Sequence, residues 1–125
     1  MNVSTPQVPV PADSGAHIDA EACRLFAEAA ELAGKKWSAA IMLALARGVT
    51  RFTDIGAAVE GVSDRLLTAR LRELEAHGLV LREVVPSVPV RVRYMLTQSG
   101  HELITILNPL VHWAKRWEPN GERPV

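Results

Sequence analysis

The fold is decided by one stretch, Ser63-Asp64-Arg65-Leu66-Leu67-Thr68-Ala69-Arg70-Leu71-Arg72-Glu73-Leu74-Glu75-Ala76-His77-Gly78-Leu79-Val80. Ser63 can cap a helix, because its hydroxyl accepts a hydrogen bond from a free amide of the first turn. Leu67, Leu71 and Leu74 recur at helical spacing and form one apolar stripe. Gly78 can adopt the left-handed conformation that ends a helix. The stretch therefore predicts a capped helix that leads directly into a strand.

The face of this helix opposite the leucines is short and rich in hydrogen-bond donors. Beside the cap Ser63, it carries Asp64, Arg65, Thr68, Ala69 and Arg72. Such a face can lie in the groove of a duplex, where arginine and hydroxyl side chains meet phosphates and base edges. The alternative is a solvated surface on which Arg72 pairs weakly with a nearby carboxylate. Asp64 is assigned first to the helix N-terminus, which favours negative charge.

The size of the chain predicts a single domain with short extensions. Its 125 residues are divided into a flexible arm over 1–18, a folded domain over 19–118 and a tail over 119–125. Several prolines make the arm a poor segment for regular structure. No apolar run approaches the ~20 residues of a membrane span. Because no basic segment followed by an apolar run opens the chain either, we expect a cytoplasmic protein without membrane contact.

The net charge is zero, which by itself argues against a nucleic-acid binder, but the charges are unevenly placed. Residues 1–33 hold one arginine against five carboxylates, whereas residues 34–93 hold ten lysines and arginines against six carboxylates. Positive charge therefore gathers around the helix described above. Such a local excess is typical of a protein that binds nucleic acid with one surface, while its other surfaces do not contact the nucleic acid. A scatter of solvated charges is the alternative explanation.

The remaining elements complete the order of a winged helix. Helices are expected over residues 19–33, 37–46, 53–59, 63–77 and 97–117, and strands over residues 79–85 and 90–96. The second helix is apolar almost all round, which makes it the buried centre. Pro109 should kink the last helix, because its ring clashes with a carbonyl of the preceding turn. We predict a mainly α fold with a small β-ribbon, a winged helix-turn-helix flanked by N- and C-terminal helices.

Further basic residues lie outside the helix of residues 63–77. Arg91 and Arg93 project from one face of the second strand, next to a turn that two prolines stiffen. Either they contact the DNA backbone or they are ordinary polar residues on the open face of a half-buried ribbon. Lys36 opens the second helix beside Lys35, and either it touches a phosphate or the two form a solvated pair.

Several short motifs occur in a characteristic order over residues 20–117. They are Gly34-Lys35-Lys36-Trp37, Arg51-Phe52-Thr53-Asp54-Ile55, the run from Gly61 to Leu74, Gly78-Leu79-Val80, the run from Pro86 to Tyr94, and Leu96-Thr97-Gln98-Ser99-Gly100. With these motifs the chain resembles the HxlR family of bacterial transcriptional regulators, a MarR-like winged-helix group. The resemblance implies a homodimer that binds double-stranded DNA at a palindromic operator, most commonly as a repressor. It places the fourth helix in the major groove and the wing near the minor groove or the backbone.

The resemblance also implies that the first and last helices form the dimer interface. The apolar stripe of residues 103–117 fits this role independently, because a domain this small does not need so much apolar surface for its own core. Other interpretations remain open for four aromatic residues and one leucine, which can line a pocket for an apolar small-molecule effector or pack in the core. The residues concerned are Phe26, Trp37, Leu110, Trp113 and Trp117.

Two positions depart from the family pattern. Arg93 stands where the family often has glutamate, which adds positive charge near the wing. The family often carries an N-terminal cysteine that senses oxidants, quinones or aldehydes, but Cys23 lies one residue further from Trp37 than usual. One residue corresponds to a rotation of about 100° around a helix. Cys23 is therefore either a redox sensor or a small buried residue, with only Arg24 beside it to stabilise a thiolate.

Other functions have weaker support. The lone cysteine excludes an intramolecular disulfide and a cysteine-based zinc site, and the four histidines are too scattered for a metal site. No catalytic or phosphate-binding motif is recognisable, so we expect no cofactor and no enzymatic activity. An enzyme with Cys23 as nucleophile would lack a positioned base. The main alternative is a winged-helix protein-interaction module without DNA binding, which the zero net charge favours.

Overall fold

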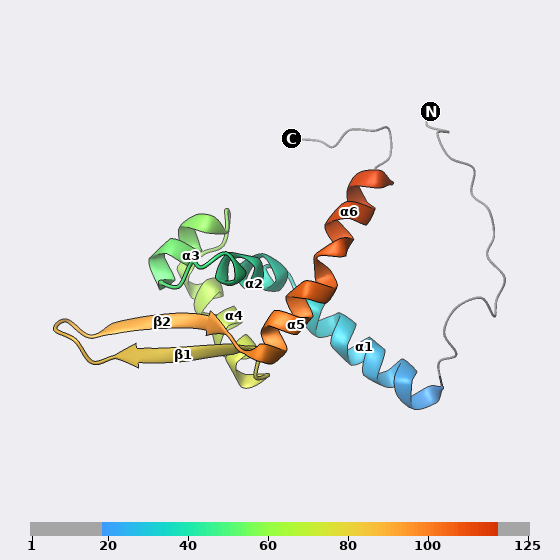
Figure 1. The fold of residues 1–125 in the computed structure, drawn as a ribbon, viewed down its shortest axis with the longest axis horizontal. Coiled ribbons are helices and arrows are strands. Elements are labelled where there is room, and N and C mark those ends of the chain that lie inside the picture. Colours follow the sequence, from blue (N-terminus) through green and yellow to red (C-terminus); the bar gives the residue numbers. More distant parts are fainter. Residues whose placement is uncertain (1–18, 118–125) are drawn as a thin grey trace.

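The computed structural model describes residues 19–117, which form a winged helix with two projecting helical segments (Figure 1). The elements follow in the order α1 (Ala20–Gly34), α2 (Ser38–Ala46), α3 (Phe52–Ala58), α4 (Asp64–Ala76), β1 (Val80–Val85), β2 (Arg91–Leu96), α5 (Gln98–Leu107) and α6 (Pro109–Arg116). The predicted winged-helix order is thus confirmed. The expected arm over 1–18 and tail over 119–125 lie outside the described residues.

The core lies where α2, α3 and α4 meet the base of the ribbon. Ile41 and Met42 of α2 and Ile55 of α3 are fully buried, and so is the predicted leucine stripe of α4. Burying one such side chain contributes about 1.5–3 kcal/mol relative to leaving it in water. The central position of α2 is therefore confirmed, although Leu43 remains exposed on its outer side.

Polar side chains cap three of the helices, α1, α4 and α5, at the predicted places. Asp19 accepts a hydrogen bond from the Ala22 amide at 2.8 Å, and Ser63 accepts one from the Leu66 amide at 3.1 Å. Thr97 accepts one from the Gly100 amide at 3.0 Å. Each cap satisfies a first-turn N–H that would otherwise lack a partner. The start of α4, which carries the predicted groove face, is fixed in this way.

Strands β1 and β2 form an antiparallel ribbon whose register runs from Val80 opposite Leu96 to Val85 opposite Arg91. Side chains alternate between the faces, so paired residues share a face. The inner face carries Val80, Arg82, Val84, Val92, Tyr94 and Leu96, and the outer face carries Leu81, Glu83, Val85, Arg91, Arg93 and Met95. The turn before α3 adds one hydrogen bond, from the Tyr94 amide to the Thr50 carbonyl at 2.9 Å.

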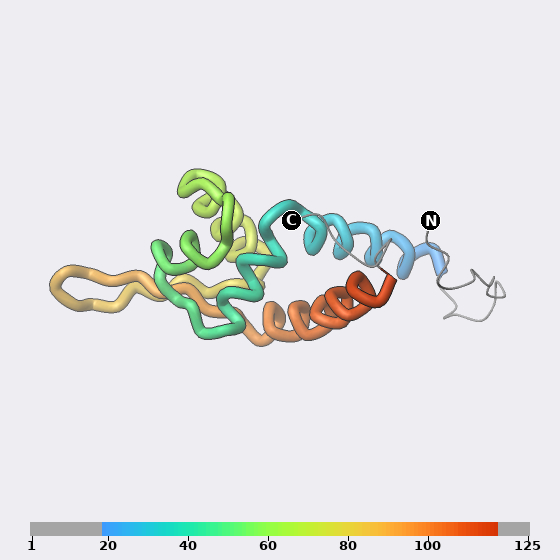
Figure 2. The backbone as a smooth tube through the Cα atoms, turned by 90° about the horizontal axis from the view of Figure 1, so that it is seen from above, coloured from blue at the N-terminus to red at the C-terminus, as the bar shows by residue number. Residues whose placement is uncertain are grey.

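The C-terminal helix is interrupted rather than merely kinked. The single helix expected over residues 97–117 is divided into α5 and α6, and Pro109 is the first residue of α6. Proline lacks an N–H and is tolerated in a first turn, where that donor would have no helical partner. Together α1 and α6 project from the body on the side opposite the wing, in both views (Figures 1 and 2). None of the described helices is long and apolar enough to cross a membrane.

One glycine allows α5 to pack against the start of the ribbon. A Cβ atom added at Gly100 would lie 2.1 Å from the Leu79 carbonyl oxygen, which is far inside contact distance. The Thr97 amide donates to the same carbonyl at 3.0 Å, and the Thr97 hydroxyl donates to the Gly78 carbonyl at 2.6 Å. The junction between ribbon and α5 is therefore built from backbone contacts that leave no room for a side chain.

Candidate nucleic-acid interface

The predicted groove face of α4 is open to solvent. Ser63, Arg65, Ala69 and Arg72 are exposed and Thr68 is half-buried, while the leucines on the opposite face are in the core. Within residues 19–117, neither Arg65 nor Arg72 belongs to an ion pair. The face is therefore held by a rigid, capped helix and keeps its donors available for an external partner.

The wing presents its two predicted arginines differently. Arg91 and Arg93 both lie exposed on the outer face. The register places Glu83 directly opposite Arg93, whose Nε donates to the Glu83 carboxylate at 3.1 Å, and a second guanidinium nitrogen contacts the same oxygen. Arg93 does add a positive charge near the wing, but Glu83 offsets it, and the contact of Arg93 with the DNA backbone stays a prediction. Arg91 has no such partner among the described residues.

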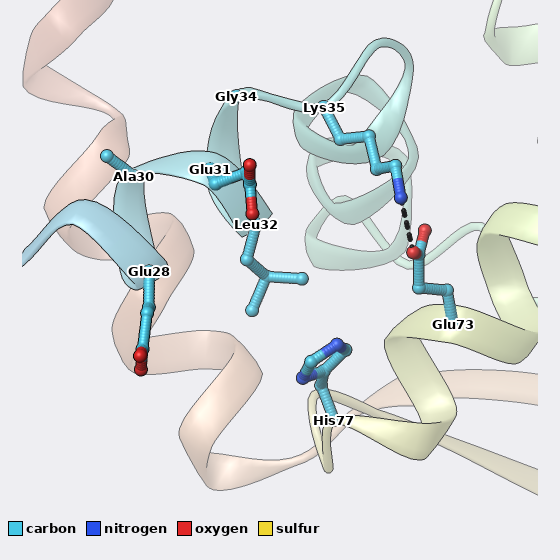
Figure 3. Close-up of a pocket in the computed structure, with 8 residues that line it drawn as sticks. All are labelled: Glu28, Ala30, Glu31, Leu32, Gly34, Lys35, Glu73 and His77. Carbon is cyan, nitrogen blue, oxygen red and sulfur yellow. Dashed lines mark hydrogen bonds and ion pairs between the residues drawn. The ribbon is translucent and has the colours of Figure 1, made fainter. Parts of the chain in front are cut away.

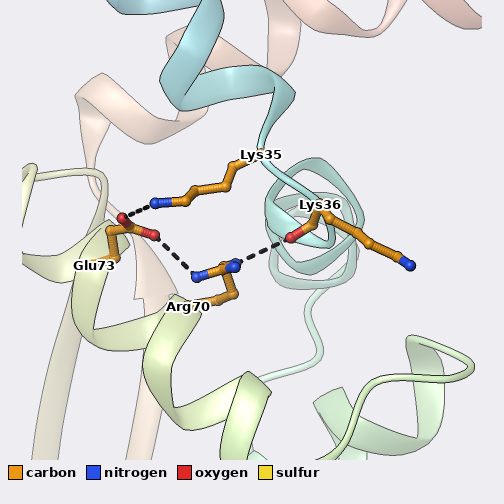
Figure 4. A network of polar contacts seen from close by, with 4 residues as sticks. All are labelled: Lys35, Lys36, Arg70 and Glu73. Atoms are coloured by element: carbon orange, nitrogen blue, oxygen red, sulfur yellow. Dashed lines mark hydrogen bonds and ion pairs between the residues drawn. The ribbon is translucent and has the colours of Figure 1, made fainter.

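A polar network joins the α1–α2 junction to α4 (Figure 4). The Lys35 ammonium donates to Glu73 at 2.6 Å, and Arg70 donates to Glu73 at 3.4 Å and to the Lys36 carbonyl at 3.1 Å. The hydrogen bond from Lys35, helped by the charges of Lys35, Arg70 and His77, holds the pKa of Glu73 below its ordinary value, while burial acts in the opposite direction. The network fixes α4 relative to the end of α1.

The Lys36 side chain points away from this network (Figure 4). Its ammonium lies 5.1 Å from the centroid of the Trp37 ring, in a cation–π contact. It is exposed, and it sits at the start of α2 rather than on α4. The structure thus places Lys36 apart from the α4 face and leaves its phosphate contact a prediction.

The apolar residues predicted for an effector pocket or a dimer interface are not gathered in one place. Trp37 is half-buried against the core, beside Gly61, and its backbone is left-handed at φ 78°. Phe26 on α1 is 70% exposed and Trp113 on α6 is 57% exposed. Leu110 and Trp117 are exposed as well. Trp37 therefore belongs to the core, whereas the other four residues lie on the projecting helices.

A hollow of about 780 Å³ lies between α1 and the C-terminal half of α4 (Figure 3). Its lining is Glu28, Ala30, Glu31, Leu32, Gly34, Lys35, Glu73 and His77. In the close-up, Leu32, Lys35 and His77 face the space, and the ion pair of Lys35 with Glu73 closes one side. None of the residues proposed for an effector pocket lines this hollow.

Cys23 is exposed, so the interpretation as a small buried residue is wrong for this chain. The physical reason is that α1 projects from the body and buries none of its residues. Within residues 19–117, no group of three or more His, Cys, Asp and Glu side chains is placed to hold a metal ion.

Sequence reasoning missed two residues beside the α4 face. Arg82 of β1 and Tyr94 of β2 are opposite each other on the inner face of the ribbon, and with α4 they line a second hollow of about 370 Å³. The sequence did contain a signal for Arg82: it lies two residues from Val80 and two from Val84, and residues two apart in a strand share a face. Only the strand pairing shows that this face turns an arginine toward α4.

The comparisons with known proteins agree with this geometry. The family model described as HxlR-like helix-turn-helix matches residues 32–122. The chain belongs to this family. It is 42% identical over 97 residues to the uncharacterized HTH-type transcriptional regulator YvaP of Bacillus subtilis, covering 78% of this chain and 90% of YvaP. It is 34% identical over 100 residues to the HTH-type transcriptional regulator YodB of the same organism, covering 80% and 89%.

Solved structures show the same architecture. The reduced form of YodB superimposes with a TM-score of 0.69 at 31% identity, covering 85% of this chain and all of YodB. The oxidized form of the redox regulator HypR gives a TM-score of 0.69 at 31% identity, with 81% and 99% covered. A quinone-bound form of YodB is also similar, with a TM-score of 0.65 at 30% identity over 76% of this chain and all of that chain. This HxlR-family chain is a transcriptional regulator with a helix-turn-helix DNA-binding fold.

Proposed function

We propose that this regulator acts as a homodimer that represses transcription by binding a palindromic operator. The observation that carries the proposal is the exposed face of α4, whose Arg65, Thr68 and Arg72 stand opposite a fully buried leucine stripe. An α-helix fits the major groove, where such side chains distinguish base pairs. The wing then lies against the neighbouring backbone or minor groove and presents Arg91, which forms no ion pair with the described residues, on its outer face.

The dimer part of the proposal rests on exposed apolar side chains. Neither α1 nor α6 buries any of its residues within the chain. The exposed apolar residues of α1, α5 and α6 and of the C-cap of α6 are Leu25, Phe26, Ile106, Leu110, Val111, Trp113 and Trp117. Soluble chains rarely leave so much apolar surface in water, so such a surface typically marks an interface. A second copy of the chain covers it, and the two-fold axis relates two α4 helices to two half-sites.

The proposal includes control by oxidants or quinones through Cys23. Its support is the exposure of the thiol on α1, together with the quinone-bound YodB and the oxidized HypR among the similar structures. With one cysteine per chain, the oxidised products are a disulfide between subunits or a mixed disulfide with a small thiol. Either product changes α1, the helix that links the proposed interface to α4.

Selection of bound fragments from random-sequence duplex DNA tests the proposal. We expect enrichment of a palindrome by the reduced protein, and loss of that binding after treatment with diamide or a quinone. The Cys23→Ser variant should bind the same palindrome and keep it under oxidant. If low salt yields no enriched sequence, the chain is instead a winged-helix protein-interaction module. If Cys23→Ser loses binding under oxidant as the wild type does, the cysteine is not the sensor.

A further inference from the structure

A small hollow lies between α4 and the inner face of the ribbon, beside the proposed groove face. Thr68, Leu71, Arg72 and Glu75 line it from α4, Arg82 lines it from β1, and Tyr94 lines it from β2. Its volume is about 370 Å³. One wall is thus part of the helix proposed to enter the major groove, and the other wall is the base of the wing.

Arg82 is the one charged residue on an otherwise apolar or aromatic face. Its neighbours two positions away are Val80 and Val84, and its cross-strand partner is Tyr94. Val80 is in the core, so this face turns toward the protein at its base. Arg82 nevertheless remains exposed, because it lies where the ribbon leaves the core and meets the hollow. Packing of Arg82 against these neighbours does not require a charged side chain at this position.

The charges around the hollow favour an anion. Two of its lining residues, Arg72 and Arg82, are free of ion pairs with described residues, and Glu75 is the single carboxylate in the lining. Thr68 adds a hydroxyl, which can donate to an anion as well as accept. A guanidinium presents several N–H donors in a fixed plane, and this geometry suits phosphate oxygens.

We propose that this hollow binds one backbone phosphate of duplex DNA, with Arg82 as the residue that contacts it. The inference rests on the proposed DNA-binding function and adds a contact between those of α4 and those of the wing. A phosphate in this position fixes how deeply α4 enters the groove, because it holds the helix and the ribbon to the same strand. The contact carries no sequence information.

Equilibrium binding of the Arg82→Gln variant tests the proposal. Binding is measured from about 50 mM to about 200 mM salt, on the selected operator and on a random duplex. We expect roughly ten-fold weaker binding to both duplexes at low salt. This loss corresponds to the lower end of the range of free energies that a hydrogen bond to a charged group contributes. The slope of log affinity against log salt should fall by about 0.9, the value for one phosphate. Arg82→Lys should keep the slope, and Arg47→Gln, at the exposed C-cap of α2 and outside the proposed interfaces, should change neither quantity.

A gain of affinity provides a second test that misfolding cannot imitate. Glu75→Gln removes the carboxylate beside the proposed phosphate and should strengthen binding to both duplexes by about two- to five-fold, the size of one charge interaction through water. Glu21→Gln at the far tip of α1 removes the same charge and should have no effect. Unchanged affinity and slope in Arg82→Gln, or a loss confined to the operator, would overturn the inference while the proposed function stands. Failure of the wild type to bind any duplex would overturn both.

Discussion

Gly100 is a residue whose replacement the fold should tolerate poorly. A methyl group there would meet the Leu79 carbonyl at 2.1 Å, so α5 or the ribbon must shift. We expect Gly100→Ala to lower the free energy of unfolding by about 1–3 kcal/mol, the usual cost of overpacking. Urea denaturation measures the change. Gly34→Ala is the matched control, because no atom lies within 4 Å of the added Cβ. Equal stabilities of the two variants would contradict the tight junction.

Glu73 should make stability depend on pH in the acid range. Its pKa is lowered in the folded chain, first by the hydrogen bond from Lys35. A carboxylate with a lowered folded pKa stabilises the fold above its unfolded pKa, and this contribution is lost as the pH falls through the folded value. The wild type should therefore lose more stability than Glu73→Gln between about pH 6 and about pH 3. Parallel pH profiles of the two proteins in urea denaturation would contradict the role of the Lys35–Glu73 pair.

At the scale of elements, the wing should bind DNA mainly through Arg91. Arg91→Gln should weaken binding to all duplexes and lower the salt slope by about 0.9. Arg93→Gln should have a smaller effect, because Glu83 already offsets that charge. Glu83→Gln frees Arg93 and should strengthen binding. A salt titration of the three variants measures these effects, and equal losses in Arg91→Gln and Arg93→Gln would show that the ion pair does not persist on DNA.

The α4 face should instead control sequence preference. Replacing Arg65 by Gln or Thr68 by Val removes groups that face the groove, at about 1–3 kcal/mol for each lost base contact. The ratio of operator to random-duplex affinity measures the effect, since a base contact changes that ratio and a phosphate contact does not. If neither variant changes the ratio, the groove face has been assigned to the wrong side of α4.

Helices, caps and strands could be predicted because their signals are local. The leucine spacing of α4 and the caps Ser63 and Thr97 depend only on neighbours in sequence. The pairing of Arg93 with Glu83 and the position of Arg82 beside α4 depend on strand register, which the sequence leaves open. The exposure of Cys23 depends on α1 leaving the body, a tertiary property that an apolar stripe does not reveal.

At the scale of the whole molecule, the projecting helices should carry dimerisation. Trp113→Glu places a charge in the apolar surface of α6 and should convert the dimer to a monomer, with a large loss of operator affinity. Val88→Ser also removes an exposed apolar side chain, but in the turn of the ribbon, and should leave association unchanged. Sedimentation equilibrium of both variants measures the association. A Trp113→Glu protein that stays dimeric would place the interface elsewhere.

This winged helix should recognise a specific DNA sequence as a dimer. The most direct measurement is the affinity of the reduced protein for the selected operator and for the same duplex with both half-sites scrambled, at one salt concentration near 150 mM. We predict a ratio of at least about 10³ in favour of the operator, with two chains bound per duplex. Equal affinities for the two duplexes would contradict sequence-specific recognition by this protein.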